Sequence, residues 1–592
     1  MPFIRKHAAA LAALFALLCA AAAPYMIPEN PDSAVFRSGT LGLILLCAAA
    51  LPAQTALRRA DRRTLCVSLA LGCLFALALS LGSELYIYDG LLRGFGSLVR
   101  RMAVPVMAAP LLGALIARLL MPADRAPASR PPRLPLWGYA LILFVCWMPL
   151  LLAYFPGMLN YDFIGEFNQH LTGEYSNLHP LLHSAIMNGV IALGEALHSR
   201  TLGVLLMSLL QMALLALALG YACAFVQRRG AGRGTMLALT ALFALHPVFS
   251  VMSVSMTKDT LFAAAFLTLS LLTFELLEQP EAFLHSRRRC ALFVVTAVGT
   301  ALLRNNGLFA LALLLPGAVI AARGMRRGVA LLSGASIAAC FLTTALLTLI
   351  YAPQTMPSFQ LYSLPAQQLV RAYNSGKLSE ADKAEIAGWY VSEEGLIVHE
   401  HLADAAKGYL DRERIEAESG EFLKLWARHA GACAHEYLEA FLMLNVGSWY
   451  PDDRSHATIY PDATWSDKGY LQTQEYDMTA EGITTRCLLP AVRNLCERIC
   501  RYNEGQEIPV LSVLLCTATP FWALLLAVAA FITRRRTRLM PAALGGLGLW
   551  LSYLFGACTL PRYALPLFAL APALLAVALR SPARKEEPAC SD

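Results

Sequence analysis

The sequence predicts an all-α polytopic membrane protein with about 14 transmembrane helices and a mainly helical extracytoplasmic domain. Of its 592 residues, 57% are hydrophobic and only 15% are charged, and the mean hydropathy is +0.53. This composition excludes an ordinary soluble domain. Apolar runs of about 20 residues, the length a helix needs to cross the hydrocarbon core, recur along the chain. Runs such as residues 202–226 do not alternate, so we expect helices rather than a β-barrel.

The predicted spans divide the chain into four parts. They lie near residues 7–27, 41–57, 65–86, 99–121, 136–155, 202–226, 236–254, 260–277, 290–303, 308–322, 329–351, 509–532, 541–557 and 563–579. The parts are N-terminal transmembrane helices (1–135), a transmembrane core (136–351) with a first long outer loop (156–201), an extracytoplasmic domain (352–508), and C-terminal transmembrane helices with a cytoplasmic tail (509–592).

Basic residues occupy alternate loops of this map, from Arg5 and Lys6 at the start to Arg580 and Lys585 near the end. Because cytoplasmic loops are enriched in Lys and Arg, we expect a multi-pass protein of the inner (cytoplasmic) membrane with both termini in the cytoplasm. The first span also fits a cleaved signal peptide, since small residues follow its apolar run. We favour a retained helix, and either interpretation leaves the later topology unchanged.

One long polar segment, residues 352–507, interrupts the apolar runs. It holds 14 Lys and Arg against 24 Asp and Glu, a net charge of −10, whereas the whole chain has +7. Apolar residues recur there every three or four positions, which predicts helices, and residues 449–476 predict an ordered loop. The sequence leaves open whether two of Cys433, Cys487, Cys496 and Cys500 form a disulfide. The spacing of these cysteines is not that of a zinc site.

The first long outer loop collects the ionisable residues that chemistry at a membrane surface would need. Asp162 follows the fifth span within about two helical turns, so a partly desolvated carboxylate is expected at the interface, where it can act as a general base. Glu166 shares a helical face with Asp162, and His179 and His183 repeat the same spacing. These four residues form either a catalytic cluster or a set of solvated loop residues.

Three cations reach the same side of the predicted topology. Lys258 and Asp259 stand at the mouth of a helix, Arg304 lies in a short turn, and Arg562 precedes Tyr563 at the last turn. Taken alone, Lys258 and Asp259 fit a snorkelling lysine with a helix-capping aspartate. Together the three cations place positive charge at lipid headgroup level, where it is otherwise sparse on this side. A phosphate ligand explains that arrangement better than chance.

Five motifs carry a resemblance to a known family: YFPGMLNYD (154–162), SNLHPLLH (176–183), SMTKD (255–259), RNNG (304–307) and PRY (561–563). With these motifs the chain resembles the DUF6020-type polytopic membrane proteins, which in turn resemble the GT-C superfamily of glycosyltransferases. The likeness covers residues 136–306 well, the polar segment poorly, and the last spans only through PRY.

The resemblance implies a GT-C-like fold and an inverting hexosyl- or pentosyltransferase. Such an enzyme moves a sugar from a polyprenyl-phosphate donor to a cell-envelope glycan, lipid or protein on the extracytoplasmic face. Asp162 matches the acidic base of GT-C enzymes, with Glu166 as a second catalytic candidate. GT-C signatures often pair two adjacent acids, whereas only Asp162 stands here, so the role of Glu166 and a divalent metal stay open. The implied donor-phosphate ligands are Lys258, Arg304, Arg562, His179 and His183.

Acceptor binding is predicted for Trp449, Tyr450 and Asp452 in the polar segment, because aromatic faces stack on sugar rings and carboxylates accept hydroxyl hydrogen bonds. An aromatic core beneath a loop is the competing interpretation. The expected partners are the polyprenyl-phosphate sugar donor, the envelope acceptor and membrane lipids, but not nucleic acid. The alternative functions are a lipid-linked glycan ligase, a transporter or flippase, and a scaffold or sensor. Polar residues gathered at one surface disfavour a transporter, whose polar sites usually lie near the midplane.

Overall fold

The computed structural model describes residues 1–26, 39–121, 134–355, 358–398, 401–452, 478–500 and 509–580. Within these ranges the chain is helical and contains only isolated β-bridges instead of strands. The predicted all-α class is therefore confirmed for the part of the chain that the structure describes.

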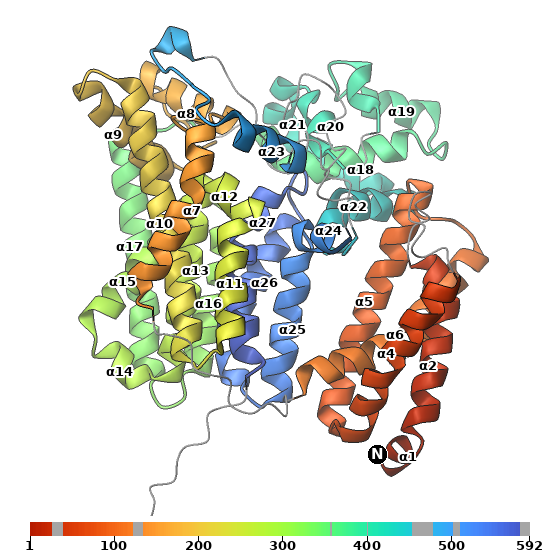
Figure 1. Cartoon of the computed structure of the whole chain (residues 1–592). Helices are drawn as coiled ribbons and strands as arrows, with labels where there is room; N and C mark the ends of the chain where they lie inside the picture. The colour runs from red at the N-terminus through yellow and green to blue at the C-terminus, as the bar shows by residue number, and fades with distance from the viewer. Residues whose placement is uncertain are drawn as a thin grey trace, which may run out of the picture.

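The helices form three groups (Figure 1). The N-terminal bundle contains α1 (Pro2–Lys6), α2 (Ala8–Ala22), η1 (Ala23–Tyr25), α4 (Gly39–Arg59), α5 (Arg62–Tyr88) and α6 (Phe95–Leu120). The core begins with α7 (Leu136–Ala153), α8 (Tyr161–Thr172), α9 (Leu181–Ala196), α10 (Arg200–Arg228), α11 (Arg233–Leu245), α12 (Pro247–Val254), α13 (Lys258–Glu278), α14 (Pro280–Leu284), α15 (Arg287–Leu302), α16 (Gly307–Ala321) and α17 (Arg326–Tyr351). It is completed by α24 (Pro509–Leu515), α25 (Thr519–Thr533), η7 (Thr537–Leu539), α26 (Pro541–Tyr553) and α27 (Pro561–Ala578).

The third group is the polar domain, which lies above the core and the N-terminal bundle in Figure 1. It contains η2 (Ser358–Tyr362), α18 (Ser363–Tyr373), α19 (Glu380–Ala387), η3 (Glu393–Leu396), α20 (Ala403–Gly408), α21 (Arg412–Ala430) and α22 (Ala434–Trp449). The later part of the polar segment, with η5 (Thr479–Glu481) and α23 (Pro490–Cys500), packs against the core beside α7 instead. This helical content agrees with the periodicity of the polar segment. The predicted loop 449–476 falls outside the described residues from position 453 onward.

Many of the helices are long and apolar enough to cross a membrane. Eight described helices meet this criterion. Helices α11 and α12 are bent by 45° relative to each other, and they make a ninth span if the pair crosses the membrane as one. Helices α9, α16 and α25 are apolar but shorter. These features indicate a multi-pass membrane protein. Because several predicted spans fall on helices shorter than the roughly 20 residues that a crossing needs, the total of about 14 stays a prediction.

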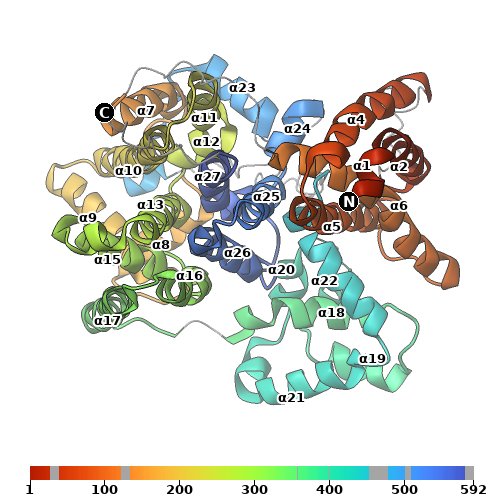
Figure 2. The same ribbon diagram turned by 90° about the horizontal axis from the view of Figure 1, so that it is seen from below.

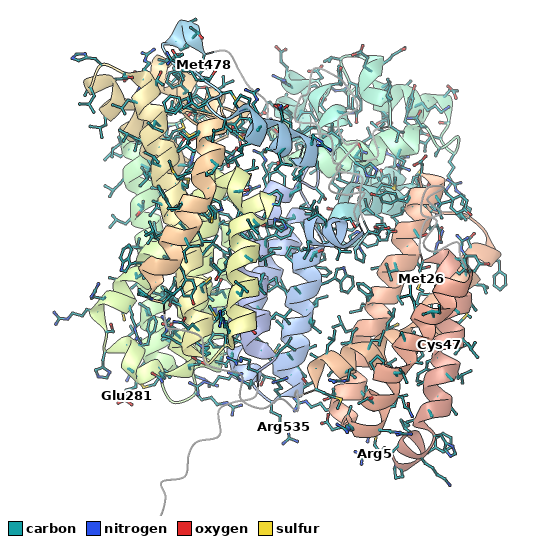
Figure 3. The ribbon with its side chains drawn as sticks, in the orientation of Figure 1. Arg5, Met26, Cys47, Glu281, Met478 and Arg535 are labelled. Carbon is teal, nitrogen blue, oxygen red and sulfur yellow. The ribbon has the colours of Figure 1, made fainter. Side chains whose placement is uncertain are left out.

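The described parts of the loops predicted to be basic lie at one end of the helices (Figure 1). Figure 3 shows Arg5, Glu281 and Arg535 at that end, and Met478 at the opposite end, on the side of the polar domain. These loops therefore share a side, as the alternation of charge predicts. We call the other end the polar-domain end, and its assignment to the extracytoplasmic side stays a prediction.

Helices α13 and α27 form the centre of the core. The apolar window of α13 is 83% buried and that of α27 is 78% buried, against 22% for α17. Helix α13 packs against α10, α15, α16, α26 and α27. A helix that is apolar on every face needs such a covering of neighbours. Both central helices begin at the polar-domain end, so their first residues are held by the best packed part of the molecule.

The polar domain has its own core and is joined to the membrane helices through α22. Trp389 and Phe422 lie in that core with their rings 5.3 Å apart. From α22, Glu436 pairs with Arg93, and the Asn445 side chain donates to the Leu554 carbonyl at 3.0 Å. Among the cysteines of the polar segment, Cys433 and Cys487 form no disulfide, and the side chain of Cys500 lies outside the described residues.

Cysteine labelling tests which end of the molecule faces out of the cell. Glu393→Cys places an exposed thiol on the polar domain, and Ala282→Cys places one at the opposite end. Because Lys and Arg mark the cytoplasmic loops, a membrane-impermeant maleimide is expected to label position 393 in intact cells and position 282 only after permeabilisation. Labelling is measured relative to the parent chain, whose native cysteines supply the background. The reverse pattern would invert the predicted topology.

Candidate active site

Two loops at the polar-domain end are joined through their backbones. The Met158 N–H donates to the Val254 carbonyl at 2.9 Å, and the Met256 N–H donates to the Met158 carbonyl at 3.0 Å. From α10, the Gln211 side chain donates to the carbonyls of Ser253 and Ser255 at 3.0 and 2.8 Å. These bonds satisfy backbone groups that would otherwise be buried without partners. As a result, the starts of α8 and α13 are fixed beside each other.

Each of these helices carries an aspartate in its first turn. Asn160 caps α8 by accepting from the Phe163 N–H at 3.0 Å, and Thr257 caps α13 by accepting from the Asp259 N–H at 3.3 Å. Asp162 and Asp259 therefore stand where the helix dipole favours negative charge. The interpretation of Asp259 as the helix cap is wrong, because Thr257 caps the helix and the aspartate is free to pair with arginine.

Five charged side chains from four segments meet at this point, and we call them the charge cluster: Asp162, Lys258, Asp259, Arg304 and Arg562. Arg562 donates to Asp162 at 2.9 Å, and the Lys258 ammonium lies 3.3 Å from the same carboxylate oxygen. Arg304 pairs with Asp259, and Arg562 Nε lies 3.8 Å from the other oxygen of Asp259. Arg562 thus bridges the two carboxylates, and the charge cluster holds one more cation than it holds carboxylates.

The charge cluster is buried, which makes its pairing essential. Asp162 is 4% exposed, Asp259 0% and Arg562 5%. Removing charges from water costs several kcal/mol per ion unless partners replace the water. Burial alone would raise the pKa of Asp162, but Lys258 and Arg562 outweigh burial and hold that pKa well below its ordinary range. Asp162 is therefore ionised in this arrangement and a weak base while both cations contact it.

The ring of Tyr563 packs against the guanidinium groups of both arginines. The Arg304 guanidinium lies 4.3 Å from the centre of the Tyr563 ring, and that of Arg562 lies 5.1 Å from it. An aromatic face attracts a cation, more strongly where water is excluded. The late PRY motif therefore supplies both a cation and the ring on which two cations rest.

Glu166 and the two histidines form a second buried group next to the charge cluster. The Glu166 carboxylate lies 2.7 Å from His183 Nδ1, accepts from the Ser184 hydroxyl at 2.8 Å, and lies 3.9 Å from His179. Burial would raise the pKa of Glu166, but His183 outweighs it and holds that pKa below its ordinary value. Burial and then Lys258 lower the pKa of His179. Glu166 therefore orients His183, and His179 is neutral at neutral pH.

The structure brings most of the predicted site residues together. Asp162, Lys258, Arg304 and Arg562 lie in one cluster, and His179 lies next to it, where Gly165 leaves room for the ring: a Cβ there would be 2.8 Å from His179 Nε2. Asp259 was missing from the predicted site. The sequence did hold a clue to Asp259, which directly follows Lys258. Because no second acid adjoins Asp162, the second carboxylate of the site could have been sought in another loop of the same end.

The predicted acceptor residues lie at and just after the end of α22, where the neighbouring Ser448 hydroxyl lies 3.2 Å from that of Thr559. Tyr450 is fully buried among α5 and α22 residues and its ring lies 5.4 Å from that of Tyr86. Its ring therefore has no face open to a sugar, and the competing interpretation as an aromatic core holds for this residue. The carbonyl of Trp449 accepts from Trp522 at 2.8 Å, and Asp452 is half-buried. Acceptor binding by Trp449 and Asp452 stays a prediction.

Among the described residues, no group of three or more His, Cys, Asp or Glu side chains is arranged to hold a metal ion. The carboxylates of the site face cations instead, so the donor set that is present suits an anionic ligand rather than a metal.

A family model matches residues 169–590. The chain belongs to the DUF6020 family. DUF6020 is described as a family of unknown function. Membership therefore confirms the resemblance to DUF6020, and it assigns no activity. The match includes Lys258, Arg304 and Arg562 and begins after Asp162 and Glu166. No curated protein and no solved structure matches this DUF6020 member.

Removal of Asp259 tests the pairing in the charge cluster. Asp259→Asn leaves Arg304 without its carboxylate partner, and breaking a buried ion pair costs about 3–5 kcal/mol. The purified DUF6020 chain is expected to unfold at a clearly lower temperature in detergent. Asp404→Asn, which removes an exposed carboxylate paired with Lys407, is the matched control and should leave the midpoint unchanged. Equal midpoints for both variants would contradict the pairing.

Proposed function

We propose that this DUF6020 member is an integral membrane glycosyltransferase of GT-C type. It transfers a sugar, with inversion, from a polyprenyl-phosphate donor to a cell-envelope glycan, lipid or protein on the extracytoplasmic face of the inner membrane. The observation that carries the proposal is the buried charge cluster at one end of the helices, in which Lys258 and Arg562 contact the carboxylate of Asp162 and Arg304 pairs with the neighbouring Asp259. Cations suit the departure of a phosphate, and a buried carboxylate next to them suits the removal of a proton once the cations have turned to the phosphate.

In this proposal the three cations bind the donor phosphate. Lys258 opens α13, Arg562 lies in the first turn of α27, and Arg304 lies in the turn before α16. As the bond between the sugar and the phosphate breaks, negative charge grows on the leaving phosphate. Fixed cations in a desolvated site stabilise this charge more strongly than they stabilise the ground state.

Donor binding would also activate the base. In the structure, Lys258 and Arg562 both contact Asp162 and hold its pKa low. The phosphodiester of the donor carries one negative charge, as a carboxylate does, but its two free oxygens accept several charge-assisted hydrogen bonds and gain charge as the bond to the sugar breaks, so it competes for these cations. Once they turn to the phosphate, burial dominates at Asp162 and its pKa rises. The base is therefore weak without donor and stronger with it.

The acceptor hydroxyl oxygen forms a bond to the anomeric carbon while the bond from that carbon to the phosphate oxygen breaks. The hydroxyl proton passes to Asp162, and the electron pair of the broken bond leaves with the polyprenyl phosphate. Glu166 takes no proton in this step; it is a positioning residue that holds His183.

A lipid-linked glycan ligase would use the same three cations on a diphosphate, and a transporter or flippase would use them to hold a headgroup. Neither needs a carboxylate as base. The requirement for Asp162 in the chemical step therefore separates the proposed transferase from a transporter, and the choice of donor separates it from a ligase.

The variant Asp162→Asn tests the proposed base. Because the amide cannot accept the proton, transfer should fall by about 10²–10⁴-fold. Because it also removes the carboxylate that competes for Lys258 and Arg562, binding of the polyprenyl-phosphate sugar should be unchanged or tighter. Transfer is measured with radiolabelled donors and envelope acceptors in lipid, and binding with the same donors. The control is Asp404→Asn, and transfer at the wild-type rate by Asp162→Asn would exclude Asp162 as the base.

The variant Arg562→Ala tests the phosphate site. Charge-assisted hydrogen bonds contribute about 1.5–3 kcal/mol, so donor affinity should fall about tenfold or more. The matched control is Arg287→Ala, which removes an exposed arginine at the opposite end of the core. An affinity equal to that of the control would assign Arg562 to structure alone.

A further inference from the structure

Beside the charge cluster, an apolar groove runs between α16 and α17. It has a volume of about 790 Å³ and is lined chiefly by apolar side chains, among them Leu311 and Leu315 of α16 and Ile337 and Phe341 of α17. Figure 2 shows α17 at the edge of the core, next to α15 and α16. Most of α17 is open to its surroundings, since its apolar window is only 22% buried. The groove is therefore a lipid-facing feature and not part of the packed core.

The groove is long in comparison with one leaflet of a bilayer. Its lining on α17 extends from Ala330 to Thr348, a distance of about 27 Å at 1.5 Å per residue. The hydrocarbon core of a bilayer is about 30 Å thick, so the chains of one leaflet fill about 15 Å. A fatty acyl chain would occupy only about half of the groove, whereas a longer hydrocarbon chain would fill it.

The upper end of the groove is polar and adjoins the charge cluster. His179 and Asn305 line that end. His179 lies close enough to Lys258 and Asp162 for both charges to affect its pKa, and Asn305 directly follows Arg304. A molecule with an anionic head at the cluster would thus have its hydrocarbon tail at the mouth of the groove.

We propose that the groove between α16 and α17 binds the long hydrocarbon tail of the donor lipid. The half of the groove that lies farther from the charge cluster, here called the deep half, makes the site select long chains over short ones. This proposal rests on the proposed function and adds to it the place of the tail and the basis of chain-length selection. The occupant is a polyisoprenoid chain with a terminal phosphate. The length of the groove and its continuity with the cations favour it over a membrane phospholipid.

A substitution at Gly334 can block the deep half of the groove and so test its role. It lines the groove near its lower end, and a Cβ added there would meet nothing within 4 Å. Gly334→Trp should therefore fill the deep half without a backbone clash. Gly334→Ala is the matched control, because it removes the same glycine and leaves the groove open. Ala312→Trp fills the groove from the α16 side and serves if Gly334→Trp does not fold.

The test is equilibrium binding of two probes, undecaprenyl phosphate and farnesyl phosphate, to the purified full chain in lipid nanodiscs. The wild type and Gly334→Ala should bind the long probe more tightly than the short one by at least about tenfold, since extra apolar contacts in a fitted groove give discrimination of this order. Gly334→Trp should lose most of this preference and keep its affinity for farnesyl phosphate. Thermal unfolding midpoints verify that the variants are folded.

Other outcomes separate this proposal from the proposed function. Equal preference for the long probe in Gly334→Trp and Gly334→Ala would overturn the groove proposal even where sugar transfer dependent on Asp162 is observed. Equal binding of both probes by the wild type would overturn it too, because the groove would then not select the length of the chain. Loss of the preference in Gly334→Trp, with no sugar transfer by any variant, would support the groove and contradict the glycosyltransferase.

Discussion

The pairing of two buried carboxylates with three cations is the constraint on which the rest of this structure depends. Asp162 and Asp259 cannot be ionised in a site with almost no exposure unless Lys258, Arg304 and Arg562 surround them. These side chains come from α8, α13, the turn before α16 and α27. The charge cluster can therefore form only when these four segments meet, and the two most buried helices of the core bring it together.

The same interactions that stabilise the fold define the chemistry that the site can perform. An ion-paired carboxylate is stable but unreactive, and a buried group with one excess cation is poised for an anion. A phosphate that competes for Lys258 and Arg562 would replace their ion pairs with Asp162 by ion pairs with phosphate oxygens, at little net cost in free energy. The site would then be reactive only when the donor is bound, which protects an otherwise reactive base in the free protein.

Much of the fold and part of the site could be predicted from the sequence because the signals are local. Apolar runs identify the helices, and polar residues at their ends identified Asp162, Lys258, Arg304 and Arg562. The pairing of Glu166 with His183, the bridge from Arg562 to Asp259 and the burial of Tyr450 depend on tertiary contacts between distant segments. Residue spacing carries no information on such contacts. Helix α9 was missed because its apolar run is short and follows an ionisable loop.

The most direct test of the central claim is a structure of the full chain in lipid with polyprenyl phosphate bound. If the charge cluster is the phosphate site, Arg562 and Lys258 will contact the phosphate oxygens, and the 2.9 Å contact of Arg562 with Asp162 will be lengthened or lost. A phosphate bound elsewhere, with the contacts from Arg562 and Lys258 to Asp162 unchanged, would show that the charge cluster serves the fold and not the reaction.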